Sequence, residues 1–277
     1  MDPVRKALWY IESRLRDDLT LEGIAAVAGV SRYHLVRAFG MATGRSVMRY
    51  VRGRRLSGAA QGLAAGAPDI LSLALDTGYG SHEAFTRAFR DQFGMTPERA
   101  RAEGHPCPLQ LVEPIILDGR LNTTLASPRF VDSPELLLAG ISEHYSYETS
   151  ANIPAQWQRF GGWADAFTGP GSGVAYGVVY NADDEGRFDY LAGISVKDFS
   201  RLTATEARLR LAPQRYAVFA SADHVSQIRP VCHAIWRDWL PNSGLQAADA
   251  PFFELYPDAF DPLTGTGGFE VWLPVQS

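Results

Sequence analysis

Apolar residues in the first hundred positions recur at spacings of three and four, which is the period of an amphipathic helix. The first such stripe consists of Val4, Ala7, Leu8, Ile11 and Leu15. The same period predicts a series of helices at residues 4–16, 21–28, 32–42, 46–64, 70–77, 82–93 and from 97 onward. We therefore expect the first part of the chain to be all-α.

Helix-capping residues mark where several of these helices begin. A Ser, Thr or Asp directly before a helix can accept a hydrogen bond from an unpaired backbone N–H of the first turn. Such residues stand at Thr20, Ser31, Asp69, Ser81 and Thr96. The agreement between capping residues and apolar period supports the predicted boundaries.

The pattern also repeats, because two stretches fifty residues apart carry matching residues. The matched pairs are Ser31 with Ser81, Leu35 with Phe85, Arg37 with Arg87, Ala38 with Ala88, Phe39 with Phe89 and Gly44 with Gly94. Each copy is predicted to form a short helix, a tight turn and a second helix, which is a helix-turn-helix. A tandem pair of such units predicts a DNA-binding module.

The second helix of each unit is the predicted DNA reader, because its exposed N-terminal part enters the major groove in helix-turn-helix proteins. The predicted contact residues are the positions that lie away from the apolar stripe: Arg32, Tyr33, Val36 and Arg37, then His82, Glu83, Thr86 and Arg87. Arg37 could donate two hydrogen bonds to a guanine or could hold a phosphate. The pattern leaves both interpretations open.

Both units resemble the DNA-binding domain of the AraC family, over about residues 4–101. The resemblance rests on Ala25, Gly29, Ser31, Leu35, Arg37 and Phe39, and on the runs Gly78-Tyr79, Phe85-Thr86-Arg87-Ala88-Phe89 and Phe93-Gly94-Met95-Thr96-Pro97. It implies seven helices, with two recognition helices in successive major grooves of double-stranded DNA, roughly 34 Å apart. The eight predicted contact residues match the family's base-contacting positions. Val36 departs from the family because it is apolar where a polar reader is common, so the recognised sequence does not transfer.

Beyond residue 107 the pattern changes from helical to strand-like. Gly and Pro at 102–108 mark the change, and we expect a linker over 108–128 between a domain at 1–107 and a second at 129–277. The order strand–helix–strand–strand occurs twice, at 134–148, 152–167, 174–180 and 188–196, then at 207–220, 225–240, 252–256 and 269–275. This predicts a multi-domain chain whose second domain is α+β, a duplicated βαββ unit that forms a curved antiparallel sheet with two helices on one face.

Charge divides the chain at the same place. Residues 1–107 hold 15 Arg and Lys against 11 Asp and Glu, a balance of +4. Residues 108–277 hold 11 against 20, a balance of −9. A basic first part suits the phosphates of DNA, and an acidic second part indicates a different partner.

Composition excludes several classes of protein. The chain has no signal-peptide pattern at its start, and no apolar run approaches the roughly 18 residues of a membrane helix. Its two cysteines, Cys107 and Cys232, form neither a disulfide framework nor a metal-ligand spacing. We expect a soluble, cytoplasmic protein that needs no cofactor, no metal and no membrane.

One carboxylate of the second domain stands among aromatic residues on a predicted strand. If Phe253 and Leu255 face the helices, then Phe252, Glu254 and Tyr256 lie on the open side of the sheet. An aromatic ring attracts a cation by about 0.5–2 kcal/mol, and a partly buried carboxylate supplies the counter-charge. A lipophilic cation would therefore suit this site. A cross-strand pair with an arginine explains an exposed Glu254 equally well.

The same domain resembles the GyrI-like effector-binding domains over about residues 130–275. The resemblance rests on the runs 188–193, 216–219, 235–244, 253–256 and 270–275. It implies that Glu254 faces a ligand groove. The expected wall residues of that groove are Trp239, Tyr190, Tyr145 and Trp272.

Three functions fit these observations. The favoured one is a transcription regulator whose first domain binds a promoter and whose second binds a small, cationic or aromatic effector, without a catalytic residue. The alternative is a small-molecule hydrolase in which Glu254 acts as general base. The third is a protein contact, in which the acidic domain engages RNA polymerase, and it does not exclude the first.

Overall fold

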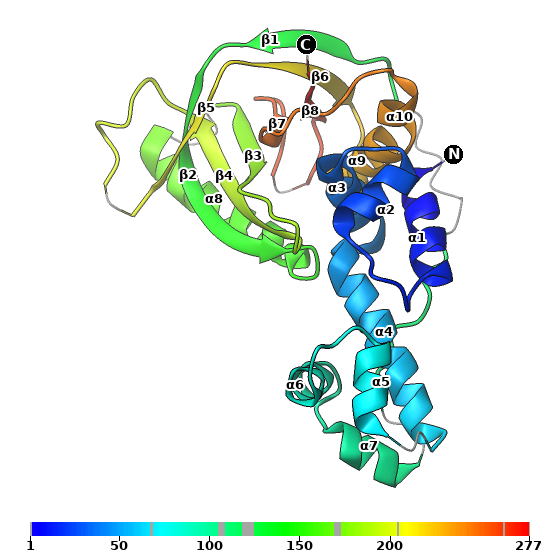
Figure 1. Ribbon diagram of the computed structural model, residues 1–277. Coiled ribbons are helices and arrows are strands. Elements are labelled where there is room, and N and C mark those ends of the chain that lie inside the picture. The colour runs from blue at the N-terminus through cyan, green and yellow to red at the C-terminus, as the bar shows by residue number, and fades with distance from the viewer. Residues whose placement is uncertain are drawn as a thin grey trace. The chain divides into compact units, whose positions relative to one another are not determined.

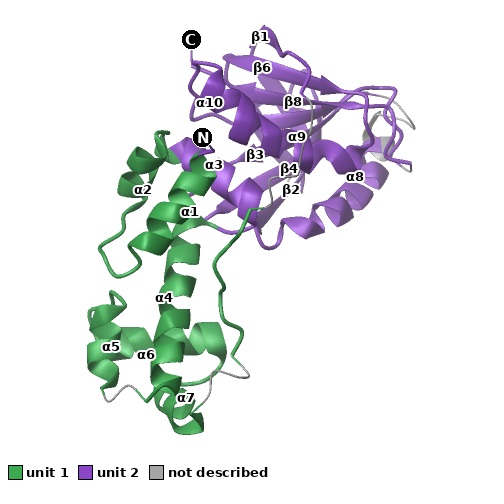
Figure 2. Cartoon of the chain, turned by 90° about the vertical axis from the view of Figure 1, so that its right-hand side faces the viewer, with its two compact units in different colours: residues 1, 3–32, 46–117 green, residues 2, 33–45, 118–277 purple. Residues whose placement is uncertain are grey.

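The computed structural model describes residues 2–66, 69–104, 109–117, 125–168, 173–203, 205–262 and 264–276. Contacts divide the chain into two compact units, shown in different colours in Figure 2. The first contains Pro3–Arg32 and Ser46–Leu117, and the second contains Tyr33–Arg45 and Asp118–Ser277. Apart from Arg32, the first predicted DNA reader therefore belongs to the unit that contains the predicted effector domain. Part of the predicted linker lies outside the described residues.

Helices α1 to α7 form the first hundred residues much as the apolar period predicts. They span Pro3–Ser13, Leu21–Ala28, Arg32–Thr43, Val47–Ala64, Ile70–Asp76, His82–Phe93 and Pro97–Glu103. The side chains of Thr20, Asp69, Ser81 and Thr96 accept hydrogen bonds from backbone N–H groups of the first turn. These four predicted caps are confirmed.

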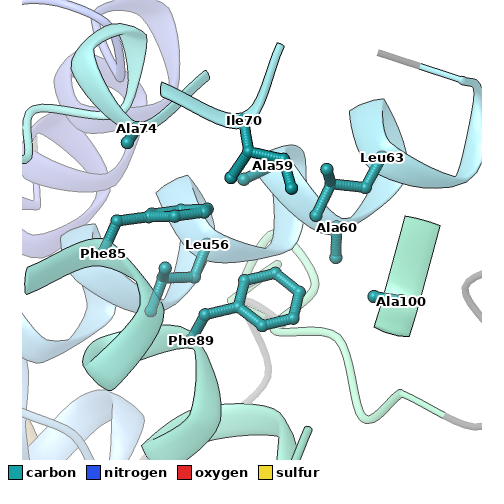
Figure 3. Packing of buried hydrophobic residues seen from close by; sticks show 9 residues of the cluster. All are labelled: Leu56, Ala59, Ala60, Leu63, Ile70, Ala74, Phe85, Phe89 and Ala100. Atoms are coloured by element: carbon teal, nitrogen blue, oxygen red, sulfur yellow. The ribbon is translucent and has the colours of Figure 1, made fainter. Parts of the chain in front are cut away.

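Aromatic side chains hold the second helix-turn-helix together. Phe85 and Phe89 of α6 are completely buried, and their ring centroids lie 5.6 Å apart. Figure 3 shows them among small and aliphatic residues of α4, α5 and α7, namely Leu56, Ala59, Ala60, Leu63, Ile70, Ala74 and Ala100. This packing fixes one side of α6 in the core and leaves the opposite side outward, as an amphipathic helix requires.

Strands β1 to β8 form one antiparallel sheet in the second unit (Figure 1). They span Arg129–Ser133, Leu136–Ser146, Ala175–Tyr180, Arg187–Ser195, Ala207–Leu211, Gln214–Ser221, Phe252–Tyr256 and Phe269–Pro274. Their order in the sheet is β1-β6-β8-β7-β3-β4-β2-β5. The curved antiparallel sheet that the sequence predicts is confirmed.

The sheet order shows the duplication and an exchange of strands between its halves. The edge strands β1 and β5 each pair with a strand of the other half, β1 with β6 and β5 with β2. The sequence pattern missed β1 and joined β5 and β6 into one strand at 207–220. Pro213 stands at the break between them, and it has no backbone N–H to donate to a neighbouring strand.

Helices cover one face of this sheet. Helix α8 (Ile153–Thr168) packs against β2 and β4, and α9 (Ile228–Ala234) packs against β8. The second helical stretch is not uniform, because a π-helical segment at Ile235–Trp239 and α10 at Leu240–Asn242 follow α9. The opposite face buries a cluster of its own, made of Leu138, Tyr176, Val178, Leu191, Leu211, Tyr216, Val218 and Phe253.

Candidate DNA-reading helices and effector site

The predicted reading face of α6 is accessible at its charged positions. Glu83 and Arg87 are exposed, whereas His82 and Thr86 are half-buried. His82 Nε2 lies 3.1 Å from Glu98 Oε1 on α7. Of the four predicted contact residues on α6, Arg87 and Glu83 are thus the most open to a partner.

Glu83 also stabilises its own helix. Its carboxylate accepts hydrogen bonds from its own backbone N–H and from Ser81, and these bonds hold the pKa of Glu83 below its usual value. A negative charge in the first turn interacts favourably with the helix dipole. Hydrogen bonding to a cytosine would compete with this role in capping.

The predicted reading face of α3 is largely buried, which corrects the expectation that all four of its residues are exposed. Val36 retains 5% and Arg37 only 2% of their accessible surface. Tyr33 is half-buried, and Arg32 is exposed and pairs with Glu22 through a 2.9 Å contact. The apolar period could not predict this burial, because the covering residues lie more than a hundred positions away in the sequence.

Other residues of the second unit cover the first turn of α3. Tyr33 Oη donates to the carbonyl oxygen of Ala250 at 3.1 Å, and His34 Nε2 lies 3.0 Å from the carbonyl oxygen of Trp236. The Trp236 ring also contacts the rings of Tyr33 and His34, at centroid distances of 6.1 and 5.4 Å. The π-helical segment and the loop before β7 therefore both contact this turn.

Arg37 is enclosed by aromatic rings. Its guanidinium carbon lies 5.4 Å from the ring centroids of both Tyr33 and Phe252, a distance typical of a cation–π contact. Its Nε and Nη1 atoms donate to no acceptor among the described residues. Because unpaired buried donors are unfavourable, the aromatic contacts offset only part of the desolvation of this charge.

Gly40 makes room for a ring that lies against α3. A Cβ at this position would lie 2.1 Å from Cε2 and Cζ of Tyr147. Tyr147 is buried, and its Oη donates to the carbonyl oxygen of Val36 at 3.4 Å. The absence of a side chain at Gly40 therefore allows Tyr147 to reach the backbone of α3.

A hydrogen-bonded network surrounds Glu254 on β7. Tyr190 and Tyr256 both donate from their hydroxyl groups to Glu254 Oε2, at 2.8 and 3.0 Å. Trp157 Nε1 of α8 donates to Tyr190 Oη at 3.0 Å, and its ring meets that of Tyr256 edge-on at 4.9 Å. Gly177, which pairs with Glu254, leaves the space for this network, because a Cβ there would lie 2.1 Å from Tyr190 Oη.

The network changes the acidity of its members. Burial raises the pKa of Glu254 above its usual value, and the hydrogen bonds from the two tyrosines and the charge of Arg229 partly counteract this. Burial and the charge of Glu254 raise the pKa of Tyr190 and Tyr256 well above the usual value, so both remain hydroxyl donors. A cation placed here would favour the ionised form of Glu254.

The sequence-based assignment of β7 to the two sheet faces is wrong. The register pairs Phe253 with Trp272, and their rings stack at 5.0 Å, so these two residues share a face. Glu254 lies on the opposite, helix-covered face, where Trp157 of α8 reaches Tyr190. The sequence shows that side chains alternate between the two faces of β7. It does not show which set faces the helices, because both faces are apolar. Trp272 therefore does not line the same site as Glu254.

The remaining predicted wall residues lie in two places. Tyr145 contacts Tyr190 edge-on, with ring centroids 6.5 Å apart, and thereby joins the Glu254 network. Trp239 packs against Phe219 at 4.8 Å. It lines a separate pocket of about 350 Å³ together with Leu125, Ala234, Asp238, Asn242 and Ser243. Trp239 thus belongs to a different surface from Tyr145 and Tyr190.

Known protein families match both parts of the chain. Residues 126–276 match the family described as GyrI-like small molecule binding domain, which is more than half of the sequence. The chain belongs to the GyrI-like family. Residues 24–103 match a helix-turn-helix domain of the AraC type, so the GyrI-like domain follows a DNA-binding type of domain.

Individual proteins resemble one part or another of this GyrI-like chain. The transcriptional regulator Rob of Salmonella typhimurium is 35% identical over 143 residues, which cover 52% of this chain and 48% of Rob. The multiple antibiotic resistance protein MarA of Escherichia coli is 35% identical over 98 residues, 35% of this chain and 77% of MarA. The structure of SAV2435 bound to tetraphenylphosphonium is 24% identical, covers 55% of this chain and 95% of that chain, and has a TM-score of 0.44. The chain spans about half the length of the curated relatives it matches first.

Two residues of the Glu254 network, Tyr256 and Trp157, were not among the expected wall residues of the groove. Tyr256 carries a usable signal, because it follows Glu254 by two positions and so shares its strand face. Trp157 carries none, because its contact with Tyr190 depends on how α8 lies against the sheet.

Features of two other protein classes are absent from the described part of the GyrI-like chain. None of its helices combines the length and apolar character that a membrane span needs. Nor do its described His, Cys, Asp and Glu residues gather in groups of three or more that could hold a metal ion.

Proposed function

We propose that this protein is a DNA-binding transcription regulator whose GyrI-like domain binds a small lipophilic cation. The observation that supports this most is the carboxylate of Glu254 within a network of aromatic residues. The tandem helix-turn-helix units and the 35% identity to Rob and to MarA support the regulatory role.

The chemistry of the site favours a cation with aromatic or apolar substituents. The rings of Trp157, Tyr190 and Tyr256 surround Glu254, and each ring attracts a cation by about 0.5–2 kcal/mol. Burial leaves the charge of Glu254 poorly solvated, which is why its pKa is raised. A bound cation would replace the missing solvation, whereas a neutral ligand would not.

DNA binding is assigned to the eight residues that match the family's contact positions, four on α3 and four on α6. Among them Arg87 is exposed and has the donors that a guanine or a phosphate requires. Selecting bound fragments from genomic DNA with the full chain would identify the promoter. A contact between the acidic domain and RNA polymerase stays a prediction.

Calorimetric titration with tetraphenylphosphonium, a permanent aryl cation, tests the effector site. Glu254→Gln should weaken this binding at least tenfold, an effect of about 1.4 kcal/mol, and should change binding of the neutral triphenylphosphine oxide much less. Glu270→Gln is the matched control. Glu270 lies on the neighbouring strand β8, on the opposite face, and accepts hydrogen bonds from Arg129 at 2.8 Å and Trp272 at 2.9 Å. If only Glu270→Gln weakens binding, the ligand binds on the face that carries Glu270 and not at Glu254.

Hydrolysis is the second candidate, favoured by the raised pKa of Glu254, because a general base is more effective when its pKa is nearer to the working pH. Incubation with an aryl ester that binds the site, followed by analysis for the carboxylic acid and the phenol, separates the two functions. Binding without product supports the regulator, and turnover that Glu254→Gln abolishes supports the enzyme.

A further inference from the structure

The covered face of α3 indicates that the second unit does more than bind an effector. We propose that the GyrI-like domain holds α3 by its DNA-reading face, so that Val36 and Arg37 are withheld from DNA until α3 is released. This inference rests on the proposed function, since it concerns the helix that is assigned to read DNA.

The contacts concentrate on one side of α3. Tyr33, Arg37 and Gly40 recur at spacings of four and three and therefore share a helix face. Tyr33 bonds to the loop before β7, Arg37 lies against Phe252, and Gly40 receives the Tyr147 ring. The covered face is thus the one that carries the predicted groove contacts, and not the apolar stripe of the helix.

Unsatisfied donors on the Arg37 side chain favour the release of α3 from the second unit. Its Nε and Nη1 atoms have no acceptor among the described residues, and aromatic rings surround its charge. A guanine edge or a phosphate would supply the acceptors that the covered state lacks. Two arrangements of one helix, each satisfying different groups, are what a ligand-controlled equilibrium needs.

The covering residues are continuous with the Glu254 site. Phe252, which contacts Arg37, precedes Glu254 by two positions and shares its face of β7. A second route runs through tilted and edge-on ring contacts, from Tyr147 to Phe188 at 5.7 Å, from Phe188 to Tyr145 at 6.2 Å, and from Tyr145 to Tyr190 at 6.5 Å. An effector that displaces Tyr190 from Glu254 would therefore disturb the same side chains that hold α3.

Cysteine labelling tests the covered state without DNA and without effector. In a full-length chain whose Cys107 and Cys232 are replaced by serine and alanine, Val36→Cys serves as the reporter of accessibility. Adding Gly40→Ala places a Cβ against the Tyr147 ring while keeping a good helix former in α3. The maleimide labelling rate of the reporter should rise at least about tenfold, because the rate follows the population of the released state.

Two controls match this substitution. Gly58→Ala makes the same change in α4, where a Cβ would meet nothing within 4 Å, and it should leave the rate unchanged. Thr86→Cys, at the corresponding position of α6, should label equally in every background. Tyr147→Ala removes the ring and leaves the sequence of α3 unaltered. It should raise the labelling rate of the reporter as Gly40→Ala does.

Equal reporter rates in the parent, Gly40→Ala and Tyr147→Ala chains would overturn the proposal, provided that circular dichroism shows the same helix content in all three. The labelling measurement uses no DNA, so its failure can be distinguished from a failure of the proposed function. If the chain binds no promoter but the labelling is still accelerated, the proposed regulatory function is refuted. The proposal that the second unit covers α3 is then retained.

Discussion

Helices α3 and α6 come from one repeated pattern, yet they differ in what surrounds them. Each is 12 residues long and carries an arginine at the corresponding position, Arg37 in α3 and Arg87 in α6. Arg37 is buried among aromatic rings, whereas Arg87 is exposed. The repeat therefore predicts which residues contact DNA, and contacts from distant segments determine which of those residues are accessible.

The largest effect is expected from removing the accessible arginine. Arg87→Ala should lower promoter affinity by about 1–3 kcal/mol, the worth of one good bidentate contact. Arg37→Ala should cost less in the parent chain, because the covered helix contributes only in the fraction of molecules that release it. Fluorescence anisotropy at ~150 mM salt measures both. If both variants lost the same promoter affinity, α3 and α6 would be equally accessible to DNA. The proposed difference between the two helices would then be wrong.

Uncovering α3 should produce the next largest change. Gly40→Ala is expected to strengthen promoter binding by up to about tenfold, because the apparent affinity scales with the binding-competent fraction. The dependence of affinity on salt should also become steeper, since a second helix adds phosphate contacts. Gly58→Ala serves again as the control. An unchanged salt slope would show that α3 adds no phosphate contacts when it is free.

A smaller effect is expected when effector is added to the reporter chain. Tetraphenylphosphonium at saturating concentration should accelerate labelling of Val36→Cys about threefold, a differential affinity below 1 kcal/mol. The same compound should leave Thr86→Cys unaffected. Acceleration that persists in Glu254→Gln would mean that the compound acts elsewhere than at this carboxylate.

The smallest effect concerns stability and follows from the raised pKa of Glu254. Because its pKa is higher in the folded than in the unfolded chain, ionisation costs stability as the pH rises from the usual carboxyl range through the raised value. Glu254→Gln removes that cost, so its Tm should exceed that of the parent by roughly 2–4 °C at neutral pH. The difference should disappear in acid, where Glu254 is protonated in both states. Calorimetric scans across pH measure this, and a lower Tm for the variant at neutral pH would contradict it.

Local signals predicted the helical part of the chain well. Capping residues such as Asp69 and Ser81, together with the apolar period, located the helices to within a few residues. The strand pattern singled out Glu254 and the resemblance added Tyr190, and the structure joins these two residues by a 2.8 Å hydrogen bond. Strand alternation also places Tyr256 on the same face as Glu254, although Tyr256 was not among the expected wall residues.

Features that depend on distant packing could not be predicted. The prediction assigned the two faces of β7 the wrong way round. Apolar residues occupy both faces, so the alternation does not reveal which face the helices cover. The burial of Arg37 depends on Phe252, more than two hundred positions later, and on the folding of that strand. The π-helical segment at Ile235–Trp239 also has no signal in a helical period.

The exchange of edge strands has a consequence for how the duplicated unit behaves as a whole. Strand β1 of the first half pairs with β6 of the second half, and β5 of the second half pairs with β2 of the first half. Each half therefore receives its edge strand from the other half. A fragment that contained only one half would present unpaired backbone along two sides, which favours aggregation. Truncation inside this region should therefore abolish folding instead of yielding a smaller folded unit.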